Sequence, residues 1–208
     1  MNRRDALGRV GLLLGGTIIG AEFFISGCKP GSSVNTDDLF SKDTIAFLNE
    51  VGETILPETK TPGAKAANVG GFMAVMVRDC YTEADQKVFK EGVGKLDEAC
   101  NKKFGKKFME ADAKQRTELL TGLDKEAKDY ATKRGADATA DKLKHKDDKN
   151  YKAPDVPNHY FTMMKQLTTL GFFTSEVGAT KALRYLPVPG KYDGNYPYKK
   201  GDKAWALS

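Results

Sequence analysis

Apolar residues recur every three or four positions in several stretches of this chain, and no stretch alternates apolar and polar residues as a half-buried strand would. The clearest series is Phe89, Val93, Leu96, Cys100 and Phe104, whose spacing places them on one face of a helix. Such a face becomes stable only when other helices cover it. Because 40% of the residues are hydrophobic, the chain can bury a core. The pattern therefore predicts an all-α fold.

Helix boundaries follow from this spacing, from capping residues, and from Pro or Gly where a helix stops. The predicted helices cover residues 37–56, 71–81, 83–104, 111–130, 157–170 and 176–184. Together they form an irregular bundle of about five to six helices within residues 37–184, with a loop over residues 57–70.

Several details of these helices can be checked. We expect Thr36 or Asp37 to cap the first helix, Thr82 to cap the third, and Thr174 or Ser175 to cap the last. The expected inward residues of the second helix are Phe72, Val75 and Met76. The expected apolar face of the fifth helix is Tyr160, Met164 and Leu167.

Two stretches lack this pattern. Residues 132–153 are mostly Lys, Asp, Ala and Thr, which predicts a solvated, partly mobile segment or a loose helix. Residues 185–208 are rich in Pro and Tyr, which predicts an extended C-terminal arm.

Residues 1–27 are predicted to be an export signal. They begin with a charged stretch that holds Arg3 and Arg4, and an apolar run of about 16 residues follows it. The run ends at Ile25-Ser26-Gly27-Cys28, which resembles a bacterial lipobox, while the arginine pair resembles a twin-arginine signal. The alternative is an uncleaved anchor, although the run is shorter than the ~20 residues that a membrane-spanning helix needs. We expect lipidation at Cys28 and a flexible tether over residues 28–36.

Residues that could carry chemistry are sparse. His145 and His159 are 14 positions apart with no companion ligands, no Gly-rich nucleotide pattern follows a strand, and Gly92-Val93-Gly94 fits a helix crossing. The sequence thus predicts no metal site, no cofactor site and no catalytic site in this chain. The net charge of +5 is too small to indicate nucleic-acid binding.

Cys80 and Cys100 are the two cysteines besides Cys28. They fall on consecutive predicted helices, one beside the connecting turn and the other about 27 Å beyond it at ~1.5 Å per residue. A disulfide needs Cα atoms within about 7 Å. We therefore expect two separate core thiols, with a disulfide as the alternative.

Three stretches resemble the gluconate 2-dehydrogenase subunit 3 family. They are residues 55–67 (ILPETKTPGAKAA), residues 103–108 (KFGKKF) and residues 170–194, which run from LGFFTSEVGA to LRYLPVPGKYDG. With the helix order and the export signal, the resemblance covers residues 40–206.

The resemblance implies a non-catalytic small subunit of a bacterial FAD-dependent sugar or polyol dehydrogenase. The flavin would belong to a separate catalytic chain of the glucose–methanol–choline class, and electrons would pass to a cytochrome c or another carrier. The small subunit would assist folding and export of that chain and hold it at the periplasmic face of a membrane. Two alternatives are a stand-alone periplasmic ligand-binding lipoprotein and an enzyme that acts alone.

Aromatic residues and prolines near the C-terminus predict the surface that meets the partner. Prolines extend the chain before binding, and Tyr and Trp supply contact area with a polar handle. The predicted interface residues are Phe172, Phe173, Tyr185, Pro187, Pro189, Tyr192, Tyr196, Tyr198 and Trp205. The alternative is that the arm folds back over the bundle and buries its rings there.

Overall fold

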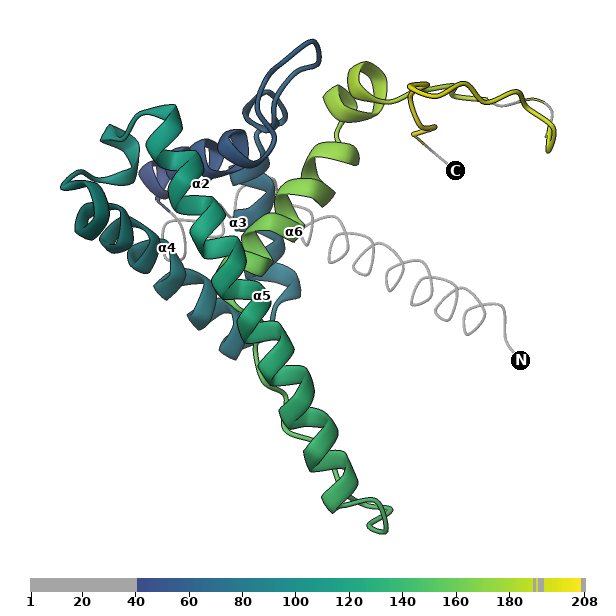
Figure 1. Cartoon of the computed structure of the whole chain (residues 1–208). Coiled ribbons are helices and arrows are strands. Elements are labelled where there is room, and N and C mark those ends of the chain that lie inside the picture. The colour runs from purple at the N-terminus through teal and green to yellow at the C-terminus, as the bar shows by residue number, and fades with distance from the viewer. Residues whose placement is uncertain (1–40, 189, 191–192, 207–208) are drawn as a thin grey trace, which may run out of the picture. The chain divides into compact units, whose positions relative to one another are not determined.

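The computed structural model describes residues 41–188, 190 and 193–206. Arg3, Arg4, Cys28, Thr36, Asp37, Pro189 and Tyr192 lie outside the described residues. Within the described ranges the regular structure is helical, and the one β-bridge joins Arg184 to Trp205 (Figure 1). The predicted all-α bundle is confirmed.

Five α-helices build the body, and three short helical turns connect or follow them. The long helices are α2 (Lys42–Ile55), α3 (Val69–Cys80), α4 (Glu83–Phe104), α5 (Ala113–Lys144) and α6 (Tyr160–Phe173). The short ones are the 3₁₀ turns η2 (Ala64–Ala67) and η3 (Phe108–Glu110) and the π-turn η4 (Gly178–Ala182).

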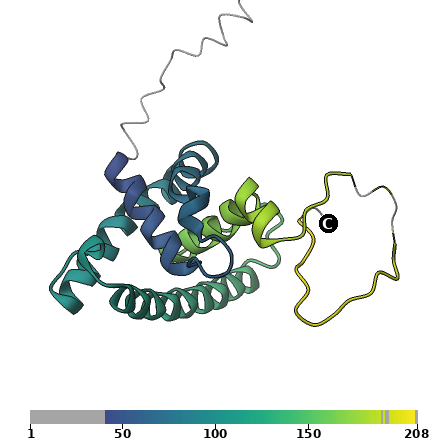
Figure 2. The same ribbon diagram turned by 90° about the horizontal axis from the view of Figure 1, so that it is seen from above.

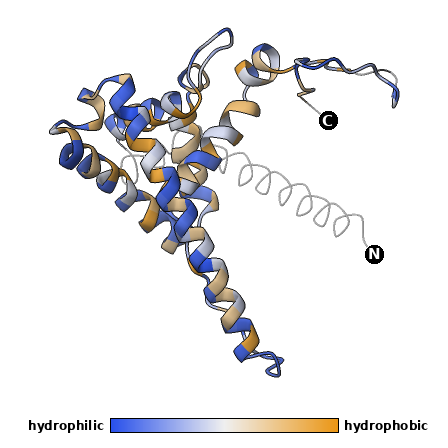
Figure 3. Cartoon of the chain, viewed as in Figure 1, coloured by the Kyte–Doolittle hydropathy of each residue, from blue (hydrophilic) through white to orange (hydrophobic). Residues whose placement is uncertain are grey.

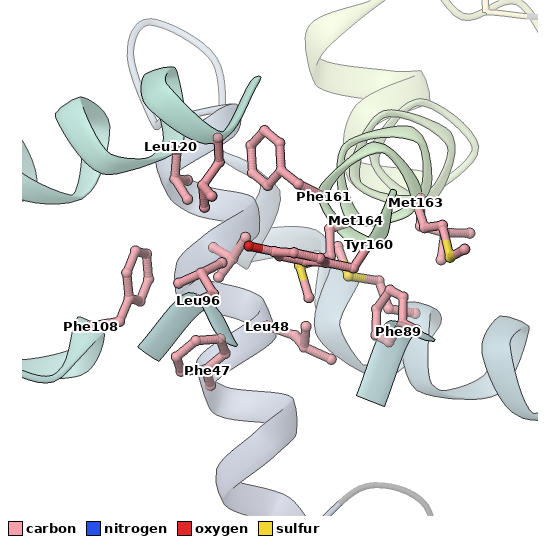
Figure 4. Close-up of a cluster of buried hydrophobic side chains, with 14 of the residues drawn as sticks. Phe47, Leu48, Phe89, Leu96, Phe108, Leu120, Tyr160, Phe161, Met163 and Met164 are labelled. Carbon is pink, nitrogen blue, oxygen red and sulfur yellow. The ribbon is translucent and has the colours of Figure 1, made fainter. Parts of the chain in front are cut away.

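Helix α6 is the centre of the bundle, because it packs against α2, α3, α4 and α5. Eight of its 14 residues are buried, which is more than one apolar stripe would bury. Figure 4 shows Tyr160, Phe161 and Met164 of α6 among the side chains of the surrounding helices, Leu48 and Leu96 among them. The predicted apolar face of Tyr160, Met164 and Leu167 is confirmed, and burial extends beyond it.

The helix ends follow the expected capping chemistry in α4. The Thr82 hydroxyl accepts a hydrogen bond from the Asp85 N–H at 3.2 Å, and Gly105 ends the helix with a φ of 67°. The start predicted for the first helix is wrong, since α2 begins at Lys42 with Ser41 as its N-cap. The Ser41 hydroxyl satisfies the Thr44 N–H at 3.2 Å, so this cap sets where the helix begins.

Helix α3 begins at Val69, two residues before the predicted start. Asn68 adopts a left-handed conformation with φ 49° and ends η2, and the Asn49 side chain accepts the Gly70 N–H at 2.8 Å. The buried residues of α3 are Val69, Gly70, Met73 and Val77.

The expected inward position of Val75 is wrong, since its side chain is 48% exposed. Gly70 lies so close to α2 that a Cβ there would stand 2.4 Å from the Ile45 carbonyl oxygen. This contact turns the Gly70 side of the helix toward α2. Phe72 and Met76 are half-buried and pack against the core.

Helix α5 continues regularly to Lys144, so the first half of the segment expected to be mobile or loosely helical is helix. Its far half has exposed polar residues, and Figure 3 shows hydrophilic positions along the whole helix. The segment that leads from α5 back to α6 is hydrogen-bonded to α5. The Tyr130 hydroxyl donates to the Pro157 carbonyl at 3.0 Å, and the Arg134 guanidinium donates to the Val156 carbonyl at 2.8 Å. Such contacts hold a helix that the core does not cover.

A half-buried arginine joins three elements of the body. The Arg116 guanidinium of α5 donates to the Glu50 carboxylate of α2 at 2.7 Å, to the Phe108 carbonyl at 3.0 Å and to the Met109 carbonyl at 2.9 Å. The Glu50 carboxylate also pairs with Lys65 of η2. Hydrogen bonds from these cations lower the pKa of Glu50, with the Lys65 contribution the largest. These hydrogen bonds and ion pairs of Glu50 and Arg116 join α2, η2, η3 and α5.

Replacing Gly92 should destabilise the protein. Gly92 of α4 faces α6 so closely that a Cβ would stand 2.3 Å from the Tyr160 Cβ, whereas nothing lies within 4 Å of a Cβ at Gly94. We expect Gly92→Ala to lower the free energy of unfolding by about 1–3 kcal/mol, because the two helices must move apart. The matched Gly94→Ala should raise it by about 0.5–1 kcal/mol through helix propensity. Urea unfolding measures both changes. Equal effects of the two substitutions would contradict the close contact between α4 and α6 at Gly92.

The ion pairs of Glu50 with Lys65 and Arg116 should make the free energy of unfolding depend on pH. Because the folded-state pKa of Glu50 lies below its ordinary 4.5, the pair's stabilisation is complete above that value and lost as the pH falls through the folded-state pKa. We expect Glu50→Gln to cost about 1–3 kcal/mol at pH 7 and progressively less in acid. Glu118→Gln is the control. It removes the exposed pair with Lys103, for which we expect less than about 1 kcal/mol at any pH. A cost of Glu50→Gln that stayed constant with pH would refute the assignment.

Candidate partner interface

The two thiols occupy different environments, and both are free. Cys100 lies in the core as expected, and burial raises the pKa of its thiol. The expectation of a core position is wrong for Cys80, which is exposed as the last residue of α3, where the chain turns toward α4. A buried, protonated thiol is a poor nucleophile, so Cys100 serves packing.

His159 is the N-cap of α6. Its Nδ1 accepts the Phe161 N–H at 3.3 Å, and its ring lies 5.7 Å from the Tyr130 ring and 4.4 Å from the Tyr160 ring, centre to centre. Burial lowers the pKa of His159, which favours the neutral ring that this acceptor role requires. Among the described residues no three His, Cys, Asp or Glu side chains gather into a metal-binding group.

An open groove of about 700 Å³ runs between α5 and α6. Ala127 and Ala131 of α5 and Leu170 and Phe173 of α6 contribute its apolar surface. Leu170 and Phe173 are 46% and 37% exposed, so this end of α6 offers apolar surface for contact with another molecule.

The chain after η4 closes into a wide loop, which Figure 2 shows beside η4. We call residues 184–206 the arm. Its two ends are joined by backbone hydrogen bonds: the Arg184 N–H donates to the Ala204 carbonyl at 2.8 Å, and the Ala206 N–H donates to the Arg184 carbonyl at 2.9 Å. The Lys203 ammonium donates to the Lys181 carbonyl of η4 at 2.6 Å. The arm is therefore a closed loop fixed at its base.

The Arg184 side chain organises the aromatic residues at this base. Its guanidinium carbon lies 4.8 Å from the centre of the Trp205 ring and 5.4 Å from the centre of the Tyr196 ring. It also donates to the Tyr196 hydroxyl at 3.0 Å, and the two rings meet edge to face at 5.8 Å. Cation–π contact and the hydrogen bond together lock the two rings to one arginine.

The predicted interface residues divide into a buried part and an exposed part. Phe172 is 4% exposed and lies in the core, so its ring is not available to a partner. Phe173 and Pro187 lie at the surface, and Tyr185, Tyr196, Tyr198 and Trp205 are 43%, 51%, 77% and 39% exposed. The rings of the arm that the structure describes are thus partly or largely open to solvent, and the arm does not bury them against the helices.

Sequence reasoning missed Arg184 as the centre of the arm. It also left out Leu170, Leu186 and Val188, which add exposed apolar surface. A single arginine among prolines and aromatic residues was the available signal. It could not be used because the partner rings follow 12 and 21 positions later, across a loop with no periodic pattern.

Removing the Arg184 side chain should open the arm. Trp205 is the only tryptophan of the chain, so its fluorescence reports on this contact alone. We expect Arg184→Ala to shift Trp205 emission to longer wavelength and to increase quenching by acrylamide, because the ring loses its covering cation. Arg134→Ala is the control, since it removes an arginine that binds the Val156 carbonyl instead. Unchanged Trp205 emission in Arg184→Ala would contradict the contact between Arg184 and the Trp205 ring.

No helix in the described part of the chain is both long enough and apolar enough to cross a membrane. A family model described as gluconate 2-dehydrogenase subunit 3 matches residues 42–190, from the start of α2 into the arm. No curated protein and no solved structure matches the chain. The match covers every helix of the body, and the chain therefore belongs to the gluconate 2-dehydrogenase subunit 3 family.

Proposed function

We propose that this chain is the non-catalytic small subunit of a periplasmic, membrane-anchored FAD-dependent sugar or polyol dehydrogenase. Its role is to assist folding and twin-arginine export of a flavin subunit of the glucose–methanol–choline class and to attach that subunit to the membrane. The observation that carries the proposal is the family match over residues 42–190.

The flavin belongs to the partner in this proposal. In the body, Cys100 is a free thiol in the core, His159 caps α6, and Glu50 forms ion pairs. This chain would therefore contribute binding surface to the complex. The oxidation would occur on the partner, which passes electrons to a cytochrome c or another acceptor. The exposed rings of the arm and the apolar end of α6 are the surfaces that this chain offers for assembly.

Export and anchoring rest on sequence. Arg3 and Arg4 form the pair expected of a twin-arginine signal, and Cys28 closes the lipobox-like stretch. The twin-arginine route carries folded cargo, so a signal on this chain can export a flavin-loaded partner that is already bound. A diacylated or triacylated cysteine then holds the complex at the membrane.

The test is co-purification from cells that contain the complete complex. A tagged chain should bring down a yellow flavoprotein from solubilised membranes. We expect the double substitution Arg3→Lys with Arg4→Lys to leave both chains in the cytoplasm, because lysine keeps the charge but not the planar guanidinium group. Arg9→Lys, outside the pair, is the control and should export normally.

Three outcomes would decide against parts of the proposal. Absence of a flavoprotein from the purified material would refute the subunit role. Normal export of both chains by the double variant would refute the twin-arginine route. Retention of this chain alone would refute its role as carrier of the partner.

A further inference from the structure

The positive charge of this protein is concentrated in its last segment. Residues 28–180 contain 24 basic and 24 acidic side chains and are neutral as a whole. Residues 184–206, the arm, contain five basic and two acidic side chains, a net charge of +3, and Lys181 of η4 adds one basic group beside its base. The body and the arm therefore present different electrostatic surfaces to a partner.

We propose that the arm is a preformed basic and aromatic clasp that docks onto an acidic face of the flavin subunit, with Arg184 as the residue that positions it. This inference rests on the proposed function and adds the chemistry of the partner's surface and the residue that shapes the arm.

The base of the arm and two of its turns are already formed in the free chain. Its ends are joined at Arg184 by two backbone hydrogen bonds, and Tyr196 and Trp205 are fixed to the Arg184 side chain. The Asp193 carboxylate accepts the Asn195 N–H at 3.0 Å, and the Asp202 carboxylate accepts the Lys199 N–H at 3.0 Å, which shapes the turns between them. A loop that is already shaped pays less ordering entropy when it binds.

Asp202 makes contacts within the arm, while Lys199 and Lys200 are exposed. Asp202 is engaged by the Lys199 N–H and lies 3.9 Å from the Arg184 guanidinium. Lys199 and Lys200 are exposed and next to Tyr198, whose ring is 77% exposed. Exposed ammonium groups beside an exposed ring fit carboxylates that surround an apolar patch.

A protein surface fits this arm better than an anionic lipid surface. Surface segments that bind lipid are commonly amphipathic helices, which satisfy their own backbone groups. The described part of the arm contains no helix, and its chain is extended around Pro187 and Pro197. A protein partner can pair with extended backbone, and a bilayer cannot.

The experiment compares two double charge reversals in the full chain with the flavin subunit that co-purifies with the wild type as the probe. The arm variant is Lys199→Glu with Lys200→Glu. The control is Lys106→Glu with Lys114→Glu, which reverses two exposed lysines of the body and changes the net charge equally. Binding is measured at low and at high salt, because a charge-steered contact weakens as salt rises.

We expect the arm variant to bind about tenfold more weakly at low salt and to lose most of the salt dependence, while the control stays within about twofold of the wild type. Arg184→Lys keeps the positive charge but removes the planar guanidinium group that lies over the Tyr196 and Trp205 rings. It should also weaken binding and shift Trp205 emission, while keeping the salt dependence. The two variants therefore separate the role of Arg184 in positioning the rings from the role of the lysine charges in binding.

Other results would overturn the inference. Wild-type affinity in the arm variant would leave the subunit role intact and refute the arm as the docking element. Equal loss in both double variants would show that total charge matters and the arm does not. The wild type could also sediment with vesicles of anionic phospholipid. If only the arm variant lost this sedimentation and still captured the flavoprotein, the arm would be assigned to the membrane. If no flavoprotein co-purifies with the wild type, the proposed function and this inference fail together.

Discussion

The fold depends on covering the broad buried surface of α6. Its buried residues include Tyr160, Met163 and Phe172, which point in different directions, so no single neighbouring helix can shield them. Four helices must approach closely, and glycines permit this at two crossings. Gly92 of α4 admits the Tyr160 side chain, and Gly171 of α6 admits the ring of Phe72. The irregular shape of the bundle follows from this requirement.

Polar contacts then fix the connections around that core. Glu50 and Arg116 are 66 residues apart and join α2 to α5, while the Phe108 and Met109 carbonyls bind the same guanidinium. On α2, the Glu53 carboxylate accepts the Glu58 and Lys65 N–H groups and holds the loop between them. Irregular segments are thereby given defined positions that hydrophobic packing alone would not supply.

The division between body and arm has a physical basis that bears on function. The body has balanced charges and buries rings such as Phe89 and Phe108 in its core, whereas the arm carries net positive charge and exposes Tyr196 and Tyr198. In the function proposed above, assembly with the flavin subunit is the use of the arm. A subunit that acts by binding can place its stability in one part and its recognition surface in another.

The sequence by itself determined the helices, because local spacing and caps such as Thr82 and Gly105 act within a few residues. It also determined the family, through stretches such as residues 170–194, and the aromatic composition of the arm. The exposure of the aromatic rings was decided by the tertiary structure. Tertiary structure decided which way α3 turns, since the close approach of Gly70 to α2 leaves Val75 outside. It also decided that α5 continues to Lys144 and that Arg184 gathers Tyr196 and Trp205. These features depend on contacts between residues distant in the chain, which no local pattern records.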